Sequence, residues 1–363
     1  MPVKIRLSSV SAHFQHGVRG DVAAVQDVSL DVAPGELVTL LGPSGCGKTT
    51  TLRMIAGFQE PSGGAIWIGD EDVTYVEANE RNIGFVFQNY ALFPHLTVFE
   101  NVAYGRRVQR ASGSEIDRDV RDVLKLVGLA GYEQQMPHQL SGGEQQRVAL
   151  ARAIVIKPRV LLFDEPLSNL DAKLRVQMRG EIRDLQRRVG ITTVYVTHDQ
   201  EEAMAISDRI AVMNKGSIAQ IGTAEELYRT PATAFVARFI GRANLIETNV
   251  AQIGANYLDL LVAGASHRIE WTGTARSIGA PCRAVVRPEA ITIGPSNGHG
   301  LIGTIKRRTY LGDKVDYAVE VFGNLLQVVQ PNPRRADRFT PGSIVSVQLP
   351  YEGVQLLGVE EDA

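Results

Sequence analysis

The chain has 363 residues, of which 44% are hydrophobic and 21% charged, a composition that predicts a folded protein of two or three domains. Its 38 basic and 40 acidic side chains give a formal net charge of -2, which argues against a general binder of nucleic acids or anionic membranes. Cys46 and Cys282 lie far apart without metal-ligand spacing, so we expect two reduced thiols in a cytoplasmic protein, without a disulfide framework or a zinc site. The N-terminus does not have the pattern of a signal peptide, and no apolar run reaches the about 18 residues of a membrane span.

Up to about residue 240, short apolar strands alternate with helical patterns, which predicts an α/β domain with a largely parallel sheet. The expected strands are residues 36–41, 160–163 and 192–196. Charged and apolar residues at helical spacing predict a helix over 172–189. Thr223 and Glu226 have capping-box spacing and open another helix, and a last helical pattern over 232–240 closes the domain.

After Gly241 the sequence is rich in turns and in short β-like runs. The expected strands are residues 257–262, 267–271, 283–287, 303–309, 316–321, 325–329 and 344–349. Short strands at this spacing predict a small barrel or sandwich. We therefore expect an α/β domain over residues 1–240, followed by an all-β domain over 241–363.

Residues 42–49 read GPSGCGKT and match the phosphate-loop pattern G-x-x-x-x-G-K-[ST], between a predicted strand and a helical run. The glycines let backbone N–H groups surround phosphate oxygens, and the following helix adds the positive end of its dipole. Lys48 can reach the β- and γ-phosphates, and the Thr49 hydroxyl can bind Mg²⁺. The expected nucleotide-binding residues here are Gly42, Pro43, Ser44, Gly45, Cys46, Gly47, Lys48, Thr49 and Thr50.

Two carboxylates follow the predicted strand 160–163. Asp164, at the end of a buried parallel strand, is well placed to hold Mg²⁺ directly or through water. Glu165 comes next, where it can activate an attacking water molecule. An apolar run before Asp-Glu is a weak signal alone, and the phosphate loop earlier in the chain makes it specific.

A third candidate motif is LSGGEQQRVALARAI, residues 140–154. Ser141 and Glu144 have capping-box spacing, so we expect a helix to begin at Ser141. Gly142 and Gly143 leave its N-terminus without large side chains, which favours a second anion-binding site. The alternative is an ordinary, well-capped amphipathic helix.

These motifs occur in a characteristic order: GPSGCGKT, Gln88 in FVFQNY, LSGGEQQR, VLLFDEP, SNLD and VTHD. In that order they resemble the ATPase subunits of ABC transporters, and the resemblance covers residues 1 to about 240. It implies a P-loop ABC ATPase domain with a helical subdomain, which binds ATP and Mg²⁺. It also implies a head-to-tail homodimer, in which the phosphate loop of one subunit and the Ser-Gly-Gly helix of the other enclose each ATP.

The resemblance assigns roles to individual residues. Phe14 would stack on adenine, unless it is an ordinary core residue. Gln88 would be a ligand of Mg²⁺ or water that senses the γ-phosphate, so the implied Mg²⁺ ligands are Thr49, Gln88 and Asp164. Asp171 of SNLD would link the two active sites, and His198 of VTHD would contact the γ-phosphate. The implied catalytic residues are therefore Glu165, His198 and Gln88. Glu144, where many members have Gln, keeps the capping box and adds a negative charge near the anion site.

The C-terminal part also has a resemblance. RPEAITI at 287–293 and YLGDKVDYAVEV at 310–321 are similar to the OB-like TOBE domain of importer ATPases, whose systems carry sugars, polyamines, ferric iron, sulfate, thiamine or phosphonates. The join FIGRANLIE at 239–247 favours the polyamine, ferric-iron and phosphonate groups. This implies a peripheral subunit at the cytoplasmic face of the cell (inner) membrane. Its implied partners are its own twin, two integral membrane permease subunits and an extracytoplasmic solute-binding protein, without nucleic acid.

Three alternatives stay open at this point. A soluble ABC ATPase acting on DNA or ribosomes would usually carry two cassettes or long coiled-coil insertions, an exporter ATPase would lack the accessory domain, and a non-catalytic regulator would lack Glu165 or His198. Residues 89–105, after Gln88, are rich in apolar and aromatic side chains. They could be helical-subdomain core, or they could form a groove for a short permease helix, with Tyr90, Phe93, Phe99 and Glu100 as candidate contacts.

Overall fold

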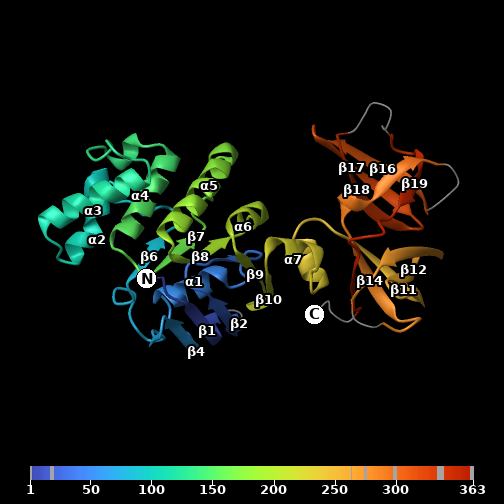
Figure 1. The fold of residues 1–363 in the computed structure, drawn as a ribbon, viewed down its shortest axis with the longest axis horizontal. Coiled ribbons are helices and arrows are strands. Elements are labelled where there is room, and N and C mark those ends of the chain that lie inside the picture. Colours follow the sequence, from blue (N-terminus) through green and yellow to red (C-terminus); the bar gives the residue numbers. More distant parts are fainter. Residues whose placement is uncertain are drawn as a thin grey trace. The chain divides into compact units, whose positions relative to one another are not determined.

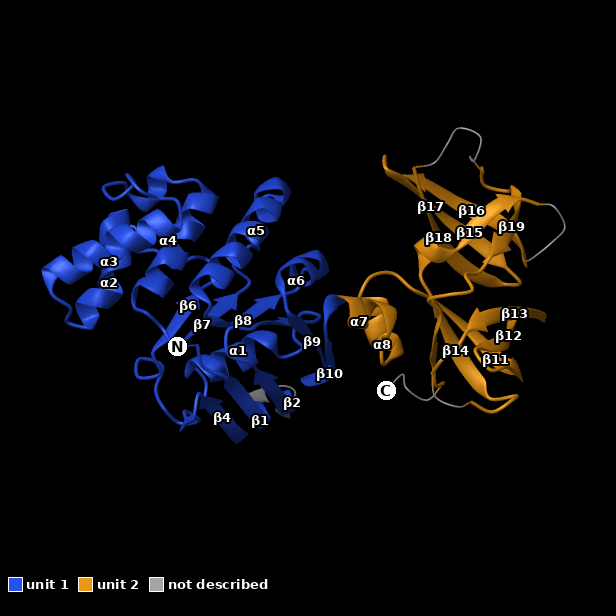
Figure 2. Cartoon of the chain, viewed as in Figure 1, with its two compact units in different colours: residues 1–224 blue, residues 225–363 orange. Residues whose placement is uncertain are grey.

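The computed structural model describes residues 2–16, 20–262, 264–273, 276–296, 301–332 and 339–359. The chain forms two compact units, residues 1–224 and 225–363 (Figures 1 and 2). This division falls earlier in the chain than the expected boundary between residues 240 and 241. Within the described residues, no helix is both long and apolar enough to cross a membrane.

The centre of the first unit is a six-stranded sheet with the order β10-β9-β3-β8-β7-β6. Its strands are β3 (Leu37–Leu41), β6 (Ile83–Val86), β7 (Val160–Asp164), β8 (Thr192–Thr197), β9 (Arg209–Asn214) and β10 (Ser217–Gly222). All neighbouring pairs are parallel except β9 and β10. The α/β prediction is confirmed, and β7 and β8 are buried at every position because both faces of the sheet are covered.

One face of this sheet packs on α1 (Lys48–Ala56) and on a four-stranded antiparallel sheet of order β2-β1-β4-β5. The strands of that second sheet are β1 (Ile5–His16), β2 (Gly20–Val32), β4 (Gly63–Ile68) and β5 (Glu71–Asp72). Val38 and Leu40 point into this layer, whereas Leu37 points to the opposite face, as strand alternation requires. The sequence pattern does not predict the second sheet, because irregularities in the pairing of β1 with β2 interrupt the alternation.

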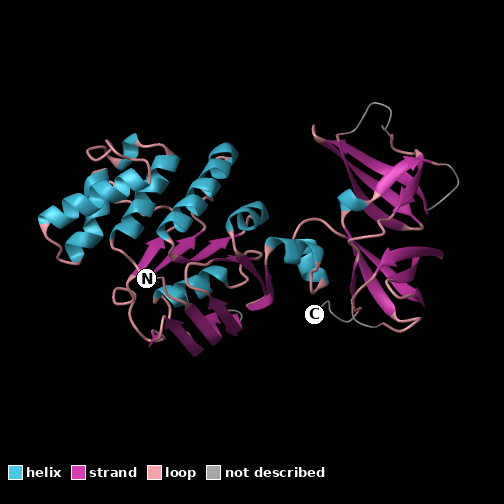
Figure 3. Cartoon of the chain, viewed as in Figure 1, coloured by secondary structure: helices cyan, strands magenta, loops and turns pink. Residues whose placement is uncertain are grey.

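Helices cover the other face (Figure 3). They are α2 (Val98–Val108), α3 (Gly113–Leu126), α4 (Gly142–Val155) and α5 (Ala172–Val189), followed by the short α6 (Gln200–Ile206). The helix α5 has the predicted bounds. The helices α2, α3 and α4 each begin with a complete capping box, so the predicted start at Ser141 is confirmed.

The second unit contains all of α7 (Ala224–Arg229) except its first residue. It continues with α8 (Ala234–Phe239) and two five-stranded antiparallel sheets. One has the order β13-β12-β11-β14-β20 and the other β15-β19-β16-β17-β18. Their strands are β11 (Asn244–Ile253), β12 (Tyr257–Val262), β13 (Ala265–Glu270), β14 (Pro281–Val286), β15 (Thr292–Pro295), β16 (Leu301–Tyr310), β17 (Lys314–Val321), β18 (Asn324–Pro331), β19 (Ile344–Gln348) and β20 (Gln355–Leu357). Side chains of both sheets share one core, so the predicted all-β architecture is confirmed.

The position of the unit boundary has a physical cause. Ala234 and Ala237 of α8 are buried with Val285 and Leu357 of the second unit. Arg287 donates hydrogen bonds to the carbonyl oxygens of Ala237 (2.8 Å) and Arg242 (3.0 Å). Helical periodicity shows that this segment is a helix, but the tertiary contacts decide which unit it joins.

Candidate functional site

The segment between β3 and α1 forms the phosphate loop. Gly45 and Gly47 have φ angles of 80° and 102°, and a Cβ at Gly47 would lie 2.5 Å from the carbonyl oxygen of Ala24, so glycine is required there. Lys48 Nζ donates to the carbonyl oxygens of Gly42 (2.8 Å) and Pro43 (2.9 Å). These contacts hold the ammonium group inside the loop, close to the unpaired N–H groups at the start of α1, where it can meet a phosphate.

Cys46 is buried within this loop. Burial raises the pKa of its thiol, while the nearby Lys48 charge acts in the opposite direction. A protonated, buried thiol is poorly reactive. The loop geometry therefore favours the interpretation of Cys46 as a small packed residue over that of a redox control point.

Two of the predicted Mg²⁺ ligands are in direct contact. Thr49 Oγ1 donates to Asp164 Oδ1 at 3.1 Å, so the start of α1 and the end of β7 meet at this point. Burial raises the pKa of Asp164, and the hydrogen bond from Thr49 only partly offsets this. A hydroxyl and a carboxylate oxygen side by side suit Mg²⁺, which usually completes its octahedron with phosphate and water.

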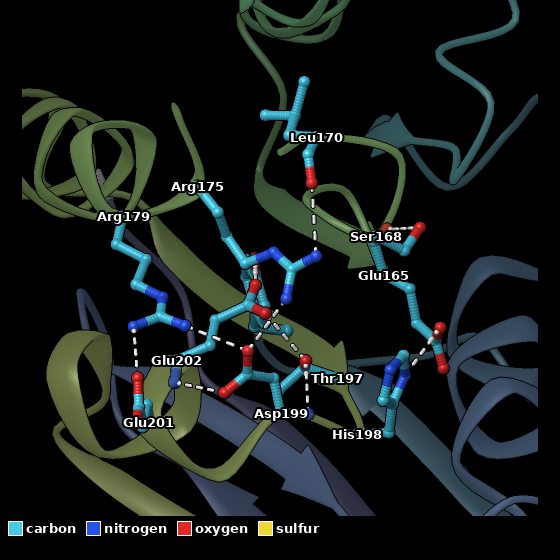
Figure 4. A network of polar contacts seen from close by, with 11 residues as sticks. Glu165, Ser168, Leu170, Arg175, Arg179, Thr197, His198, Asp199, Glu201 and Glu202 are labelled. Carbon is cyan, nitrogen blue, oxygen red and sulfur yellow. Dashed lines mark hydrogen bonds and ion pairs between the residues drawn. The ribbon is translucent and has the colours of Figure 1, made fainter. Parts of the chain in front are cut away.

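The structure brings Glu165 and His198 together (Figure 4). Glu165 follows β7 and His198 follows β8, and the two strands are parallel neighbours, so their carboxyl ends lie at one edge of the sheet. His198 Nδ1 lies 3.0 Å from Glu165 Oε2. Glu165 has a φ of 46°, an uncommon conformation for a residue with a side chain, and its N–H donates to the Val196 carbonyl at 3.0 Å. The main chain therefore fixes Glu165 in place, while the side chain of His198 is 58% exposed.

A buried polar network lies behind His198. The Glu202 carboxylate accepts hydrogen bonds from the Tyr195 hydroxyl and, at 2.9 Å, from Thr197 Oγ1. Burial raises the pKa of Glu202, although both of these hydrogen bonds act to lower it. Asp199 caps α6 by accepting from the Glu202 N–H at 3.1 Å. We did not predict this network, although polar residues inside the buried strand TTVYVT are a signal that could have indicated it.

The predicted anion-binding helix α4 has the expected start. Ser141 Oγ donates to Glu144 Oε2 at 2.7 Å, and Glu144 N–H donates back to Ser141 Oγ at 3.4 Å. The hydrogen bonds from Ser141 lower the pKa of Glu144, so its negative charge stays on the first turn. A Cβ at Gly142 would come within 3.0 Å of Leu170 Cδ2, which shows that this N-terminus packs on the SNLD segment of the same chain.

The other predicted residues lie at the edges of this site. Gln88 is exposed, and its carbonyl accepts a hydrogen bond from Asn169 Nδ2 at 2.9 Å. Asp171 caps α5 through a 3.0 Å hydrogen bond from the Leu174 N–H. Phe14 is 40% exposed on β1, so it is not the buried core residue of the alternative interpretation. Residues 17–19, in the long segment after it, lie outside the described residues. Among the described residues, no hydrogen bond joins Phe14 or residues 141–144 to the phosphate loop.

Comparisons with known proteins agree with this geometry. The family model described as ABC transporter matches residues 25–168, and the TOBE domain model matches residues 284–357. The Fe(3+) ions import ATP-binding protein FbpC 1 of Rhizobium meliloti is 49% identical over 338 residues, covering 93% of this chain and 94% of that protein. The spermidine/putrescine import ATP-binding protein PotA of Rubrobacter xylanophilus is 45% identical over 360 residues, covering 98% of this chain and 94% of that protein.

Two solved structures resemble the first part of the chain. A dimeric bacterial ABC transporter cassette has a TM-score of 0.54 and 33% identity, and the match covers 60% of this chain and 98% of that chain. An ATP-binding cassette in a post-hydrolysis state bound to ADP and Pi has a TM-score of 0.53 and 32% identity, with the same coverage. The motifs, the fold and these relatives lead to one conclusion: the chain belongs to the ABC transporter ATPase family, in the form that carries a C-terminal TOBE domain.

Proposed function

We propose that this chain is the ATP-hydrolysing subunit of an ABC importer. The observation that carries the proposal is the contact of the Glu165 carboxylate with the His198 imidazole, beside the Thr49–Asp164 pair. A candidate general base, an imidazole and a pair of oxygen ligands for a metal thus meet at the edge of the sheet that holds the phosphate loop. This combination supports phosphoryl transfer to water.

The chain's own residues supply most of the chemistry. The loop N–H groups and Lys48 bind the phosphates, while Phe14 offers its exposed ring to the adenine. Thr49 and Asp164, with Gln88, would hold Mg²⁺, which when bound neutralises charge on the phosphates. Glu165 accepts a proton from the attacking water, and His198 holds the γ-phosphate and orients that water.

The proposal includes a homodimer. Ser141, Gly142 and Gly143 would bind the γ-phosphate held by the partner's loop, and Asp171 would link the two sites. The likeness to a dimeric cassette at 33% identity supports this arrangement. The glycines support it too, because the Ser141 cap takes up the Glu144 N–H and leaves the N–H groups of Gly142 and Gly143 for an anion. Glu144 holds a negative charge on the same turn, so this site is weaker than it would be with an uncharged Gln.

A groove beside Gln88 offers a docking site for a permease. It has a volume of about 370 Å³ and is lined mainly by apolar side chains, including Phe85, Phe87, Phe93, Tyr104 and Ile156. The Phe93 and Tyr104 rings are 4.8 Å apart, and Tyr104 is 46% exposed. An exposed aromatic groove of this kind suits a short amphipathic helix.

The residues that line the groove differ in part from the contact residues expected from the sequence. Tyr90 is buried, and Phe99 packs against the core of the helices, so neither lines the groove. Tyr104 and the aromatic residues at the end of β6 take their places. For Phe99 and Tyr104 the reason is that α2 turns one face to the core and the other to the groove, and only the tertiary packing decides which residue lies on which face.

Ferric iron is the solute that we propose first, and polyamine is the second candidate. The 49% identity to an Fe(3+) import protein supports the first, and the 45% identity to a spermidine/putrescine import protein supports the second. Both names also support import over export. The subunit would then lie at the cytoplasmic face of the inner membrane, beneath two permease subunits that receive solute from an extracytoplasmic binding protein.

Uptake measurements test this function. Cells that lack the chain should lose import of radiolabelled ferric iron, and the wild-type chain should restore it while Glu165→Gln should not. Loss of spermidine import instead would replace iron with polyamine as the solute. If neither solute were affected and the purified chain released no phosphate from ATP and Mg²⁺, the proposal would fail.

A further inference from the structure

The short segment 168–171, between β7 and α5, contacts the surroundings of every proposed catalytic residue. Ser168 Oγ donates to the Glu165 carbonyl at 2.9 Å, and Asn169 Nδ2 donates to the Gln88 carbonyl at 2.9 Å. The next residue, Leu170, accepts at its carbonyl a 3.2 Å hydrogen bond from Arg175 Nη2. Glu165 and Gln88 are thus held directly by this segment, whereas the third catalytic residue, His198, is reached through its contact with Glu165 and, on the side of its own main chain, through Arg175.

Arg175 makes that connection with its planar fork (Figure 4). While Nη2 binds the Leu170 carbonyl, Nη1 donates to Asp199 Oδ2 at 3.3 Å. Asp199 is the residue directly after His198, and its own N–H donates to Thr197 Oγ1 at 3.0 Å. The imidazole is largely exposed, so the position of His198 depends on this main chain and on Glu165. The guanidinium group therefore joins segment 168–171 to the backbone that carries His198.

Charge neutralisation alone does not explain Arg175. Arg179, one turn further along α5, donates to the same Asp199 oxygen at the shorter distance of 2.9 Å. Burial raises the pKa of Asp199, but the Glu202 N–H and the charges of Arg179 and Arg175 together hold it below its usual value. Asp199 would therefore keep a cationic partner without Arg175. What Arg175 adds is the contact with Leu170. This contact is maintained although the buried Nε of Arg175 has no hydrogen-bond partner among the described residues.

We infer that Arg175 is a positioning residue for His198, which transmits the position of segment 168–171 to the imidazole. This inference rests on the proposed ATP hydrolysis. It extends to α4, because Leu170 lies against the N-terminus of that helix at Gly142. A movement of the Ser141 end of α4 is thus passed through Leu170, Arg175 and Asp199 to His198. Guanidinium is suited to this role because its rigid fork binds two acceptors at once, which a single ammonium group does not do in a fixed geometry.

The test is Arg175→Lys in the full-length chain, with Arg183→Lys as the matched control. Arg183 lies on the same helix and also forms an ion pair, with Asp208, but this pair does not involve segment 168–171. We expect Arg175→Lys to lower kcat roughly tenfold with an unchanged KM for ATP, since a small misplacement of a catalytic group has effects of this order. Arg183→Lys should keep the wild-type kcat. Thermal unfolding of both variants checks that they fold.

A double-mutant cycle separates positioning from general damage. If Arg175 acts through His198, adding Arg175→Lys to His198→Ala should cause no further loss of the residual phosphate release. The inference about Arg175 is overturned if the losses of the two single variants multiply in the double variant, or if Arg175→Lys has the kcat of the wild type. Neither result would affect the proposed ATP hydrolysis. If Arg175→Lys does not fold, Asp199→Asn removes the same link from the other side and must show the same non-additivity with His198→Ala. A wild-type chain that hydrolyses no ATP would instead overturn the proposed function, and the inference with it.

Discussion

His198 Nδ1 lies 3.0 Å from Glu165 Oε2, although 33 positions separate the two residues in the sequence. The contact leaves the other oxygen of the carboxylate available to accept a proton from water, since a carboxylate has lone pairs on both oxygens. It also fixes the rotation of the exposed imidazole. One contact thus orients both the candidate base and the imidazole that we propose to contact the γ-phosphate.

Replacing Glu165 by Gln should lower turnover by about 10²–10⁴-fold, the usual contribution of a general base. ATP binding should persist, because the phosphate loop and Lys48 are untouched, and an ATP-bound dimer should accumulate. Phosphate release and binding of a fluorescent ATP analogue measure the two effects separately. Glu225→Gln is the control, since Glu225 is an exposed carboxylate of α7 whose ion pair, with Arg229, does not involve Asp199 or segment 168–171. Near-normal turnover of the Glu165 variant would remove this residue from the role of base.

The affinity for Mg²⁺ should weaken as the pH falls. A carboxylate must be ionised to bind a metal, and burial raises the pKa of Asp164, so protonation competes with Mg²⁺ at a higher pH than for an ordinary aspartate. The concentration of Mg²⁺ that gives half-maximal phosphate release should therefore rise as the pH is lowered, and the rise should begin at a higher pH than it would for an aspartate with an ordinary pKa. In the Asp164→Asn variant, the Mg²⁺ concentration needed for half-maximal phosphate release should be high at every pH. A requirement in the wild type that does not change with pH would contradict the role of Asp164 as a ligand.

Ser141→Arg should abolish hydrolysis, because the large side chain would fill the turn that we propose binds the ATP held by the partner subunit. Ser112→Arg is a close control, since Ser112 caps α3 with Glu115 in the same capping-box geometry. Each variant loses one helix cap, at a cost of roughly 1 kcal/mol in stability, so the two should unfold alike. Only the Ser141 variant should lose phosphate release. Equal activities of the two variants would argue against the shared ATP site.

A charge in the aromatic groove should uncouple transport from hydrolysis. Tyr104→Glu or Phe93→Glu places a carboxylate where an apolar helix would dock, which costs several kcal/mol if the charge is buried there. Solute uptake should fall by at least roughly tenfold, the effect of 1.4 kcal/mol, while phosphate release by the isolated chain stays the same. Val108→Glu is the control, because Val108 is exposed on the same helix but does not line the groove. Normal uptake with either groove variant would exclude this surface as the docking site.

Local patterns predicted the elements that depend on few neighbours. The strand 160–163 was recognisable because it is a continuous apolar run, and the helix 172–189 because its spacing is regular over many turns. The strand β1 was not, because irregular pairing with β2 breaks its alternation. The helix α8 was predicted as a helix, but its pattern could not show that Ala234 and Ala237 would pack with the second unit.

The sequence by itself determined the chemical groups of this protein. The phosphate loop, the Asp164–Glu165 pair and the capped Ser-Gly-Gly helix are runs of adjacent residues, in which backbone geometry and spacing are enough to indicate phosphate chemistry. Only the tertiary structure decided how these groups meet. The contact of His198 with Glu165 and the bridge from Leu170 through Arg175 to Asp199 join separate segments of the chain. Such contacts arise from the order of strands in the sheet and the packing of α5, and a residue's type does not specify its neighbour in space.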